Sequence, residues 1–418
     1  MREPTPLLAM HECDLMKRML RVLSAVCIVV PLYGATVTSV PTFSKDVAPL
    51  FYKNCAGCHR PGETAPMSLL SYKEARPWAA SIAEKVLDRS MPPWLADPHV
   101  GNFENARALS AEEIRTISTW ARNGAPEGDP RDLPPAPRFP EGWHIGKPDM
   151  VLSMNEDYAV PAAGTIPYQN FRVETTLEED KWVKAAEIRP GNRAIVHHVI
   201  VYMREPGGPA AQAGKPTPSD GRDPLLVGFA PGEQPAVYPE NQGKLLKKGT
   251  TLIFQLHYTP NGTAGTDRTS VGLIFAKEPP ARKVVTWRAL NSSFVLPPGD
   301  ANHEVISSWT APEDLHINIF MPHMHLRGKD FKYTLVYPDG RREVVLNVPR
   351  YDFNWQLVYR LAEPLAVPKG TKIECVAHFD NSANNKFNPD PAKEVKWGPQ
   401  TWEEMMIGWF DYTMDKGL

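Results

Sequence analysis

The segment that most constrains this chain is Cys55-Ala56-Gly57-Cys58-His59. Cys-x-x-Cys-His is the attachment signal of c-type haem. Two thiols add to the vinyl groups of the haem, and the adjoining histidine is placed to ligate its iron. Zinc would require a second ligand pair at suitable spacing, and a thioredoxin-like redox pair would require a strand–helix–strand context. The flanking sequence offers neither, so we predict one covalent haem c held by Cys55, Cys58 and His59.

Helical patterns surround this motif. Residues 47–52 carry an apolar helical face, and residues 72–89 predict a second helix. Ser110-Ala111-Glu112-Glu113 forms a capping box that would open a third helix, which Asn123-Gly124 would end. Residues 40–130 therefore resemble a small, all-α class I cytochrome c domain.

Cytochromes of this kind usually take a methionine as the sixth iron ligand. Met91 follows a predicted helix, and the prolines after it would stiffen the loop that presents its sulfur. Met67 lies only eight residues past His59 and has less chain with which to reach the opposite face of the haem. We predict Met91 as the ligand, with Met67 as the alternative. A purely structural methionine remains open at both positions.

The N-terminus has the features of an export signal. Met16-Lys17-Arg18 begins a positively charged region, and residues 22–33 supply a short apolar stretch. This stretch is too short to cross a bilayer comfortably, although an uncleaved anchor is an alternative. We expect residues 1–39 to be a leader, the protein to be periplasmic or otherwise exported, and the mature chain to lack an integral membrane segment.

Charge and cysteine content narrow the possibilities further. The net charge of −2 and the absence of a long basic run give no indication of nucleic-acid binding. Of the five cysteines, Cys13 and Cys27 fall in the predicted leader and Cys375 stands alone. With the haem attached, no pair is left for a disulfide. Stability must then come from packed cores.

Beyond a proline-rich linker at residues 131–147, the sequence changes character. Runs rich in Val, Ile, Leu and aromatic residues predict strands at 193–203, 251–258, 317–321, 331–337 and 372–379. Pro338-Asp339-Gly340 predicts a hairpin turn, whereas residues 204–250 predict mostly loop. We expect two all-β antiparallel sandwich domains, jelly-roll-like, over residues 148–285 and 286–418.

Five of the twelve histidines group on or directly after these predicted strands: His197, His198, His257, His323 and His325. His323 and His325 would share one face of a regular strand and could hold one metal ion. His197 and His198 are adjacent and would point to opposite faces. They can meet one ion only at a bulge, at a strand end or through different ring nitrogens. His257 lies on another strand, and a structural role explains any one of these residues equally well.

The donor types narrow the choice of metal. Imidazoles without adjoining carboxylates argue against magnesium, calcium and the iron site of two histidines and one carboxylate. Three histidines with an open position would also suit a zinc hydrolase. A thioether would instead favour copper(I), and Met405 and Met406 are available near the C-terminus.

Four short motifs carry a family resemblance from about residue 148 to the end. In order they are Val196-His197-His198, Leu256-His257-Tyr258, the run from His323 to Gly328 (His-Met-His-Leu-Arg-Gly), and Glu404-Met405. This arrangement resembles the two-copper, ascorbate-dependent monooxygenases, the family of dopamine β-monooxygenase and peptidylglycine α-hydroxylating monooxygenase. The resemblance implies two β-sandwich domains that face each other across a solvent-filled cleft, each with one copper.

The same resemblance implies a role for each ligand. His197, His198 and His257 would hold the electron-storing copper, and the oxygen-binding copper would be held by His323, His325 and Met405. The family's animal members have disulfides, which this chain cannot form. His316 and His378 lie outside the matched set, and we expect them to be structural.

The resemblance also bears on the substrate. Where the peptide-amidating branch of the family holds a carboxylate with polar residues, this chain has Met321, Ile407 and Trp409. We therefore expect a monooxygenase that uses O₂ to hydroxylate a C–H bond of a small, uncharged molecule. The fused haem suggests that a periplasmic electron donor feeds the two coppers.

Two other functions remain open at this point. The chain could be an electron-transfer or copper-binding protein without oxygenase activity. It could also be an oxidoreductase that passes substrate electrons from copper to haem.

Overall fold

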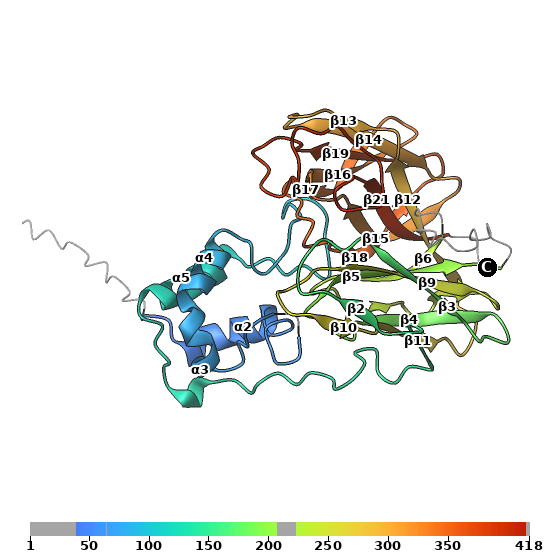
Figure 1. The fold of residues 1–418 in the computed structure, drawn as a ribbon. Helices are drawn as coiled ribbons and strands as arrows, with labels where there is room; N and C mark the ends of the chain where they lie inside the picture. The colour runs from blue at the N-terminus through green and yellow to red at the C-terminus, as the bar shows by residue number, and fades with distance from the viewer. Residues whose placement is uncertain (1–38, 64, 207–222, 415–418) are drawn as a thin grey trace, which may run out of the picture. The chain divides into compact units, whose positions relative to one another are not determined.

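The computed structural model describes residues 39–63, 65–206 and 223–414. From Pro41 onward the chain forms one compact unit, which consists mostly of β-strands with few helices (Figure 1). The predicted leader lies outside the described residues except for Ser39, and so do Cys13 and Cys27. No helix in the described part of the chain is long and apolar enough to cross a membrane.

The helices occupy the segment before residue 123. They are the π-helical turn η1 (Phe43–Val47), α2 (Ala48–Asn54), α3 (Tyr72–Ala75), the 3-10 turn η2 (Arg76–Trp78), α4 (Ala79–Leu87) and α5 (Ala111–Arg122). The single helix predicted over 72–89 is therefore three pieces. Pro77 explains the break, because it has no N–H to donate and its ring crowds the preceding turn.

The capping box predicted for the third helix is confirmed at α5. The Ser110 hydroxyl accepts a hydrogen bond from the Glu113 N–H at 3.1 Å, and the Glu113 carboxylate accepts from the Ser110 N–H at 2.7 Å. At the other end Gly124 has φ +82°, the left-handed conformation that suits a residue after a helix.

The helices pack around their own aromatic core. Phe43, Phe51 and Trp120 are fully buried, and their ring centroids lie 6.1 to 6.2 Å apart. This core fixes α2, at whose end Cys55 donates its N–H to the carbonyl of Phe51. The first cysteine of the predicted haem motif is thus anchored to the helical core.

The segment between α4 and α5 contacts the later β-structure. Phe103 forms an isolated bridge with Leu361, and the Asn105 side chain donates to the carbonyl of Val358 at 2.7 Å. After α5, the turn η3 (Pro130–Asp132) is followed by residues 133–149, in which the structure has no helix or strand. This stretch contains most of the predicted linker.

The first half of the β-structure is a sandwich of two layers around one core. One layer has the order β3 (Gln169–Glu174), β9 (Thr251–Tyr258), β5 (Val196–Arg204) and β6 (Leu225–Phe229). The other has β1 (Met150–Ser153), β11 (Ser270–Phe275), β4 (Lys181–Arg189) and β8 (Gln242–Leu246). Side chains from both layers fill the core, among them Val199, Phe254, Val183 and Leu273. The short β7 (Ala236–Val237) pairs with β4, and β2 (Tyr158–Val160) pairs with β10 (Gly265–Asp267).

The stretch predicted to be mostly loop, residues 204–250, also contains three short strands that the sequence did not predict: β6, β7 and β8. These strands are only two to five residues long and lie among prolines and glycines, which hid their pattern. They form because β5 and β4 offer pairing edges. Residues 207–222 lie outside the described part of the chain.

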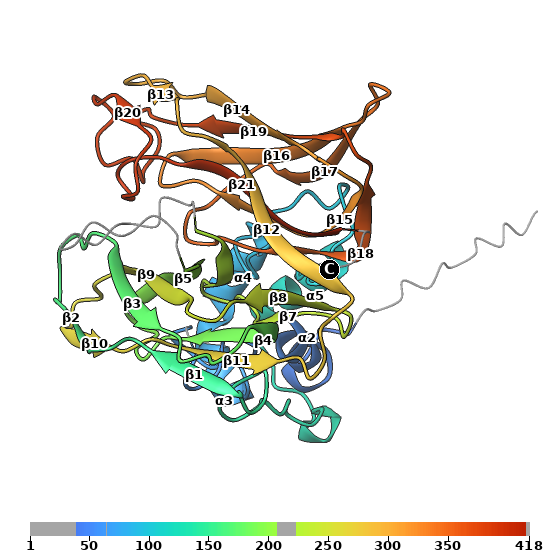
Figure 2. The same cartoon turned by 90° about the vertical axis from the view of Figure 1, so that its right-hand side faces the viewer.

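The second half repeats the arrangement of two layers (Figure 2). One layer has the order β14 (His303–Thr310), β19 (Lys372–Phe379), β16 (Gly328–Val336) and β17 (Arg342–Val348). It packs on β12 (Arg282–Asn291), β21 (Met406–Met414), β15 (Leu315–His323) and β18 (Tyr359–Val367), with Phe320, Tyr333 and Phe410 in the core between them. The small pair β13 (Val295–Leu296) and β20 (Val395–Lys396) completes it. The predicted hairpin turn joins β16 to β17, and its Gly340 has φ +86°.

The two halves share one sheet. Strands β8 and β12 pair in parallel through Gln242 with Arg282 and Gly243 with Lys283. This link produces a nine-stranded sheet that contains strands of both halves. The expected β-sandwich architecture is thus confirmed in outline. The domain boundaries stay predictions, and the predicted boundary between residues 285 and 286 falls inside β12.

Candidate functional site

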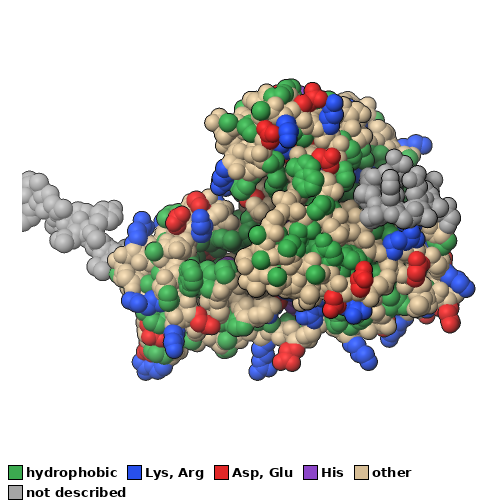
Figure 3. Space-filling model, viewed as in Figure 1, with side chains coloured by type: hydrophobic (Ala, Val, Ile, Leu, Met, Phe, Trp, Pro, Cys, Tyr) green, Lys and Arg blue, Asp and Glu red, His purple; other side chains and the backbone are tan. Residues whose placement is uncertain are grey.

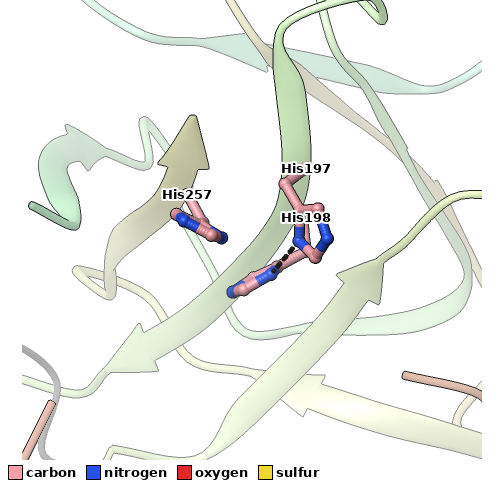
Figure 4. Close-up of side chains that lie close together, drawn as sticks. All are labelled: His197, His198 and His257. Carbon is pink, nitrogen blue, oxygen red and sulfur yellow. Dashed lines mark hydrogen bonds between the residues drawn. The ribbon is translucent and has the colours of Figure 1, made fainter. Parts of the chain in front are cut away.

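His197, His198 and His257 converge at one end of the β5–β9 pair (Figure 4). One ring nitrogen from each lies within 4.8 Å of the others. A β-bulge makes this possible: Val196 pairs with Tyr258 and His198 with His257, so β5 carries one extra residue at His197. The extra residue breaks the alternation of the strand. As a result, the Nδ1 atoms of the two adjacent histidines lie 3.1 Å apart.

The hydrogen bonds of this first group leave nitrogen lone pairs for a ligand. His197 Nε2 lies 3.4 Å from the side-chain oxygen of Asn354. An amide oxygen only accepts, so this contact places the proton on Nε2 and the lone pair on Nδ1. His257 Nδ1 is buried without a hydrogen-bond partner. One ring nitrogen of His257 lies near one ring nitrogen each of His197 and His198. A metal ion bound between them would accept a lone pair from all three.

His323 and His325 form the second group, with ring centroids 5.2 Å apart. His323 Nδ1 donates to the side-chain oxygen of Gln356 at 2.7 Å, and His325 Nδ1 donates to the Glu403 carbonyl at 3.2 Å. Both contacts leave Nε2 as the atom with the lone pair. His325 Nε2 is buried and has no hydrogen-bond partner, so this pair also fits a metal. Because β15 ends at His323, a loop and not a regular strand presents His325.

Met405 belongs to the segment that adjoins this second group. It precedes β21, in which Ile407 pairs with His323. Its neighbour Glu404 is fully buried and accepts the backbone N–H groups of His325 at 2.8 Å and Arg327 at 2.7 Å. One carboxylate therefore ties the His-x-His loop to the chain that carries Met405.

Electrostatics favours the metal-binding form of these imidazoles. Burial is the largest cause of a lowered pKa in all five histidines, and it takes the pKa of His257 to about 3 and that of His323 to about 4. At neutral pH the rings are thus uncharged and ready to donate a lone pair. Burial also raises the pKa of Glu404 to about 8. The two backbone N–H groups that bind its carboxylate lower this pKa, but their effect is smaller than that of burial.

A Glu404→Gln variant should show what this carboxylate contributes. An amide would point its NH₂ group at one of the two backbone N–H donors. Leaving that donor unsatisfied in a buried site should lower the free energy of unfolding by about 1–3 kcal/mol. Denaturant unfolding of the metal-free protein at a pH above 8, where Glu404 is ionised, measures this, with Glu394→Gln as the control because Glu394 is half exposed. Equal stability of the two variants would refute the anchoring role.

The two histidine groups lie close to each other. The Gln356 side chain contacts His323 Nδ1 through its oxygen, and its nitrogen lies 3.4 Å from His198 Nδ1. The Tyr168 ring centroid lies 5.1 Å from that of His257 and 6.3 Å from that of His325. In place of the solvent-filled cleft that the resemblance implies, packed side chains connect the groups. Sequence reasoning missed Gln356 and Tyr168, since neither lies in a recognisable motif.

A small apolar space adjoins both groups. A cavity of about 40 Å³ is lined by His198, His323, Gln356, Met321 and Trp409, among others. Met405, Ile407 and Trp409 are buried in one cluster, against which Met321 packs. Met321, Ile407 and Trp409, which the family resemblance relates to substrate binding, therefore lie beside the second group. The same cavity is lined by Glu233, which sequence reasoning also missed; burial raises its pKa.

A second, larger cavity of about 340 Å³ contains the predicted haem ligands. Cys55, Cys58 and His59 line it, and so do both candidate methionines, Met67 and Met91. His59 Nδ1 donates to the Met67 carbonyl at 3.3 Å, which leaves Nε2 as the nitrogen that can ligate iron. The residues present therefore fit a haem. With its backbone tied to His59, Met67 lies on the histidine side, and this favours Met91 for the opposite face.

The other histidines and the surface add little to these sites. His378 Nδ1 lies 2.7 Å from the Asp330 carboxylate, and its Nε2 lies 3.5 Å from the Glu304 carboxylate, so each ring nitrogen has an acidic partner. These two contacts agree with a structural role for His378.

On the face shown in Figure 3, acidic and basic side chains are interspersed.

Comparisons with known proteins do not assign a family. No protein-family model and no curated protein matches the chain. Among solved structures, the major capsid protein P2 of bacteriophage PM2 aligns over 64% of this chain and 99% of its own, with 11% identity and a TM-score of 0.28. The infectious bursal disease virus Gx strain structure aligns over 63% of this chain and 72% of its own, with 8% identity and a TM-score of 0.18. Likenesses this weak carry no argument about fold or function.

Proposed function

We propose that this protein is a copper-dependent monooxygenase that uses O₂ to hydroxylate a C–H bond of a small, uncharged organic molecule. The carrying observation is the pair of neighbouring histidine groups, each with a buried ring nitrogen that lacks a partner. A buried ring nitrogen without a partner is costly, and a metal ion would satisfy it. Two such groups beside each other favour a pair of metal sites, and the apolar side chains next to them suit an uncharged molecule.

The donor set favours copper in both sites. His197, His198 and His257 would hold one ion, and His323, His325 and Met405 would hold the other. A thioether is a soft ligand that prefers copper(I), and the described residues place no carboxylate among the three histidines of the first group. When bound, the coppers would supply O₂ activation and one-electron storage.

The protein's own residues have three tasks in this proposal. Gln356 and the Glu403 carbonyl hold the protons of His323 and His325 on Nδ1, so that Nε2 faces the metal. Glu404 fixes the loop that carries His325. Met321 and Trp409 line the neighbouring space, and Ile407 packs with Trp409 in the adjoining buried cluster. These three apolar side chains offer no partner for a carboxylate.

The haem would serve as the entry point for electrons from a periplasmic donor. Cys55 and Cys58 would attach it, His59 would ligate the iron, and Met91 would be the sixth ligand. This proposal includes an exported protein, because the predicted leader precedes the helical segment. A cytochrome c character for residues 40–130 is part of the same proposal, supported by the cavity and the free Nε2 of His59.

Metal and haem analysis of the purified protein tests the proposal. We expect two coppers and one covalent haem per chain, with two copper(II) signals in the EPR spectrum. Zinc in place of copper would refute the monooxygenase and favour a hydrolase. Product should form only when O₂ and a reductant are both present.

The direction of electron flow needs a separate measurement. Reduced carrier is mixed with the fully oxidised protein in the absence of O₂, and haem and copper absorbance are followed. Reduction of haem before copper supports feeding through the haem. Substrate that reduces the haem without O₂ would instead identify an oxidoreductase that sends electrons outward.

A further inference from the structure

We propose that residues Phe353-Asn354-Trp355-Gln356 form the electron path from the haem cavity to both histidine groups. This inference rests on the proposed function and specifies how its two cofactor sites communicate. The segment lies between β17 and β18 in the sequence and belongs to none of the motifs that predicted the sites.

The third residue of the segment, Trp355, reaches the large cavity. Trp355 lines this cavity together with Cys55, Cys58 and His59. It also packs against the core of the second β-sandwich, and its backbone N–H donates to the Asp352 carbonyl at 2.9 Å. The indole is therefore held beside the space that a haem would fill.

The other residues of the segment contact the histidines directly. The Phe353 ring is stacked on His197 with a centroid distance of 5.2 Å and an interplanar angle of 14°. Its centroid also lies 5.8 Å from that of His257 and 5.9 Å from that of His325. Phe353 thus touches members of both groups.

Two polar side chains add hydrogen-bonded links. Asn354 accepts from His197 Nε2 at 3.4 Å, which reaches the first group. Gln356 lies between His198 Nδ1 and His323 Nδ1, which joins the two groups. Four consecutive residues therefore contact the haem cavity and both candidate metal sites.

Such a segment has the physical properties of a tunnelling path. Electron tunnelling weakens steeply across non-bonded gaps, whereas covalent bonds, hydrogen bonds and stacked rings preserve coupling. The proposed transfer moves one electron from a ferrous haem to a copper(II), giving a ferric haem and a copper(I). No bond is made or broken, and the chain itself is neither oxidised nor reduced.

Flash photoreduction of the haem in oxidised, copper-loaded protein without O₂ measures this transfer directly. The decay of the ferrous haem absorbance reports the electron leaving for copper, and copper-free protein should show no such decay. In Trp355→Leu we expect the rate constant to fall about tenfold, because loss of the ring weakens the electronic coupling while the driving force stays the same; a tenfold change equals about 1.4 kcal/mol on the free-energy scale. The conservative Trp355→Phe variant keeps a ring in place and should recover most of the rate.

Two further variants sharpen the test. Trp287→Leu is the matched control, because Trp287 is exposed and lies outside the cavity lining. Asn354→Ala probes the His197 end at an exposed position where folding is not at stake, and it should also slow the transfer. Haem spectrum and haem potential should be unchanged in all four variants, and copper content should be unchanged in the three tryptophan variants.

The outcomes separate this inference from the proposed function. Absence of covalent haem or of copper in the wild-type protein would refute the proposed function itself. Wild-type transfer rates in both Trp355→Leu and Asn354→Ala, with both cofactors present, would overturn the path alone. That result would favour a route through Gly232, whose carbonyl accepts from Arg107 and which lies in the lining of the same cavity.

Discussion

A Met405→Ile variant is expected to lose hydroxylation entirely while its haem spectrum stays intact. Isoleucine has a similar volume but no sulfur lone pair, so His323 and His325 would be left as the only ligands of their copper. Met405 is buried in an apolar cluster, and such a swap should cost less than about 1.5 kcal/mol of stability. Product analysis, a copper(I) affinity titration and the haem absorption spectrum measure the effect.

Met406→Ile provides the matched control. Met406 is the next residue, but its side chain is fully buried in the core of the second sandwich, on the other face of the chain. It should retain hydroxylation and copper affinity. Persistent product formation by Met405→Ile would exclude Met405 as a ligand of the catalytic copper.

The double variant Cys55→Ser/Cys58→Ser has the second large expected effect. A hydroxyl group does not form the thioether that attaches haem c, so the purified chain should carry no covalent haem. Reduction of the coppers by the protein carrier should then stop, although a small reductant such as ascorbate should still reach them. Haem stain on a denaturing gel and anaerobic copper reduction measure these two results.

Loss of the haem should also weaken the helical segment. The cavity of about 340 Å³ would remain without the group that fills it, so we expect a lower midpoint of thermal unfolding for the variant. Cys375→Ala is the control, because Cys375 is buried in the β-core far from the motif in sequence. It should keep haem and carrier-driven reduction. Normal carrier-driven reduction of copper in the double variant would refute the haem as the entry point.

Much of the secondary structure was predictable because the signals are local. The strands at 251–258 and 372–379 were predicted with the bounds that the structure shows. In β19, buried and partly exposed residues alternate along the whole strand. The capping box at Ser110 needs only residues within one turn of the helix. Strands β6 to β8 were missed, since they are short and depend on partners that lie elsewhere in the sequence.

The sequence by itself determined the chemistry available to this protein. It supplied the Cys-x-x-Cys-His motif, the five histidines of the two groups and Met405, and residue identity alone sets which metals such donors prefer. It also determined the alternation of apolar residues that builds the sandwiches.

Only the tertiary structure decided how those donors meet. His197 and His198 share one side because the ladder with β9 contains a bulge, and a ladder's register depends on a strand that lies some 55 residues away. Gln356 and Phe353 join the two groups because a loop of the second sandwich packs against the first. Contacts of this kind depend on packing between distant segments, for which a local sequence pattern carries no signal.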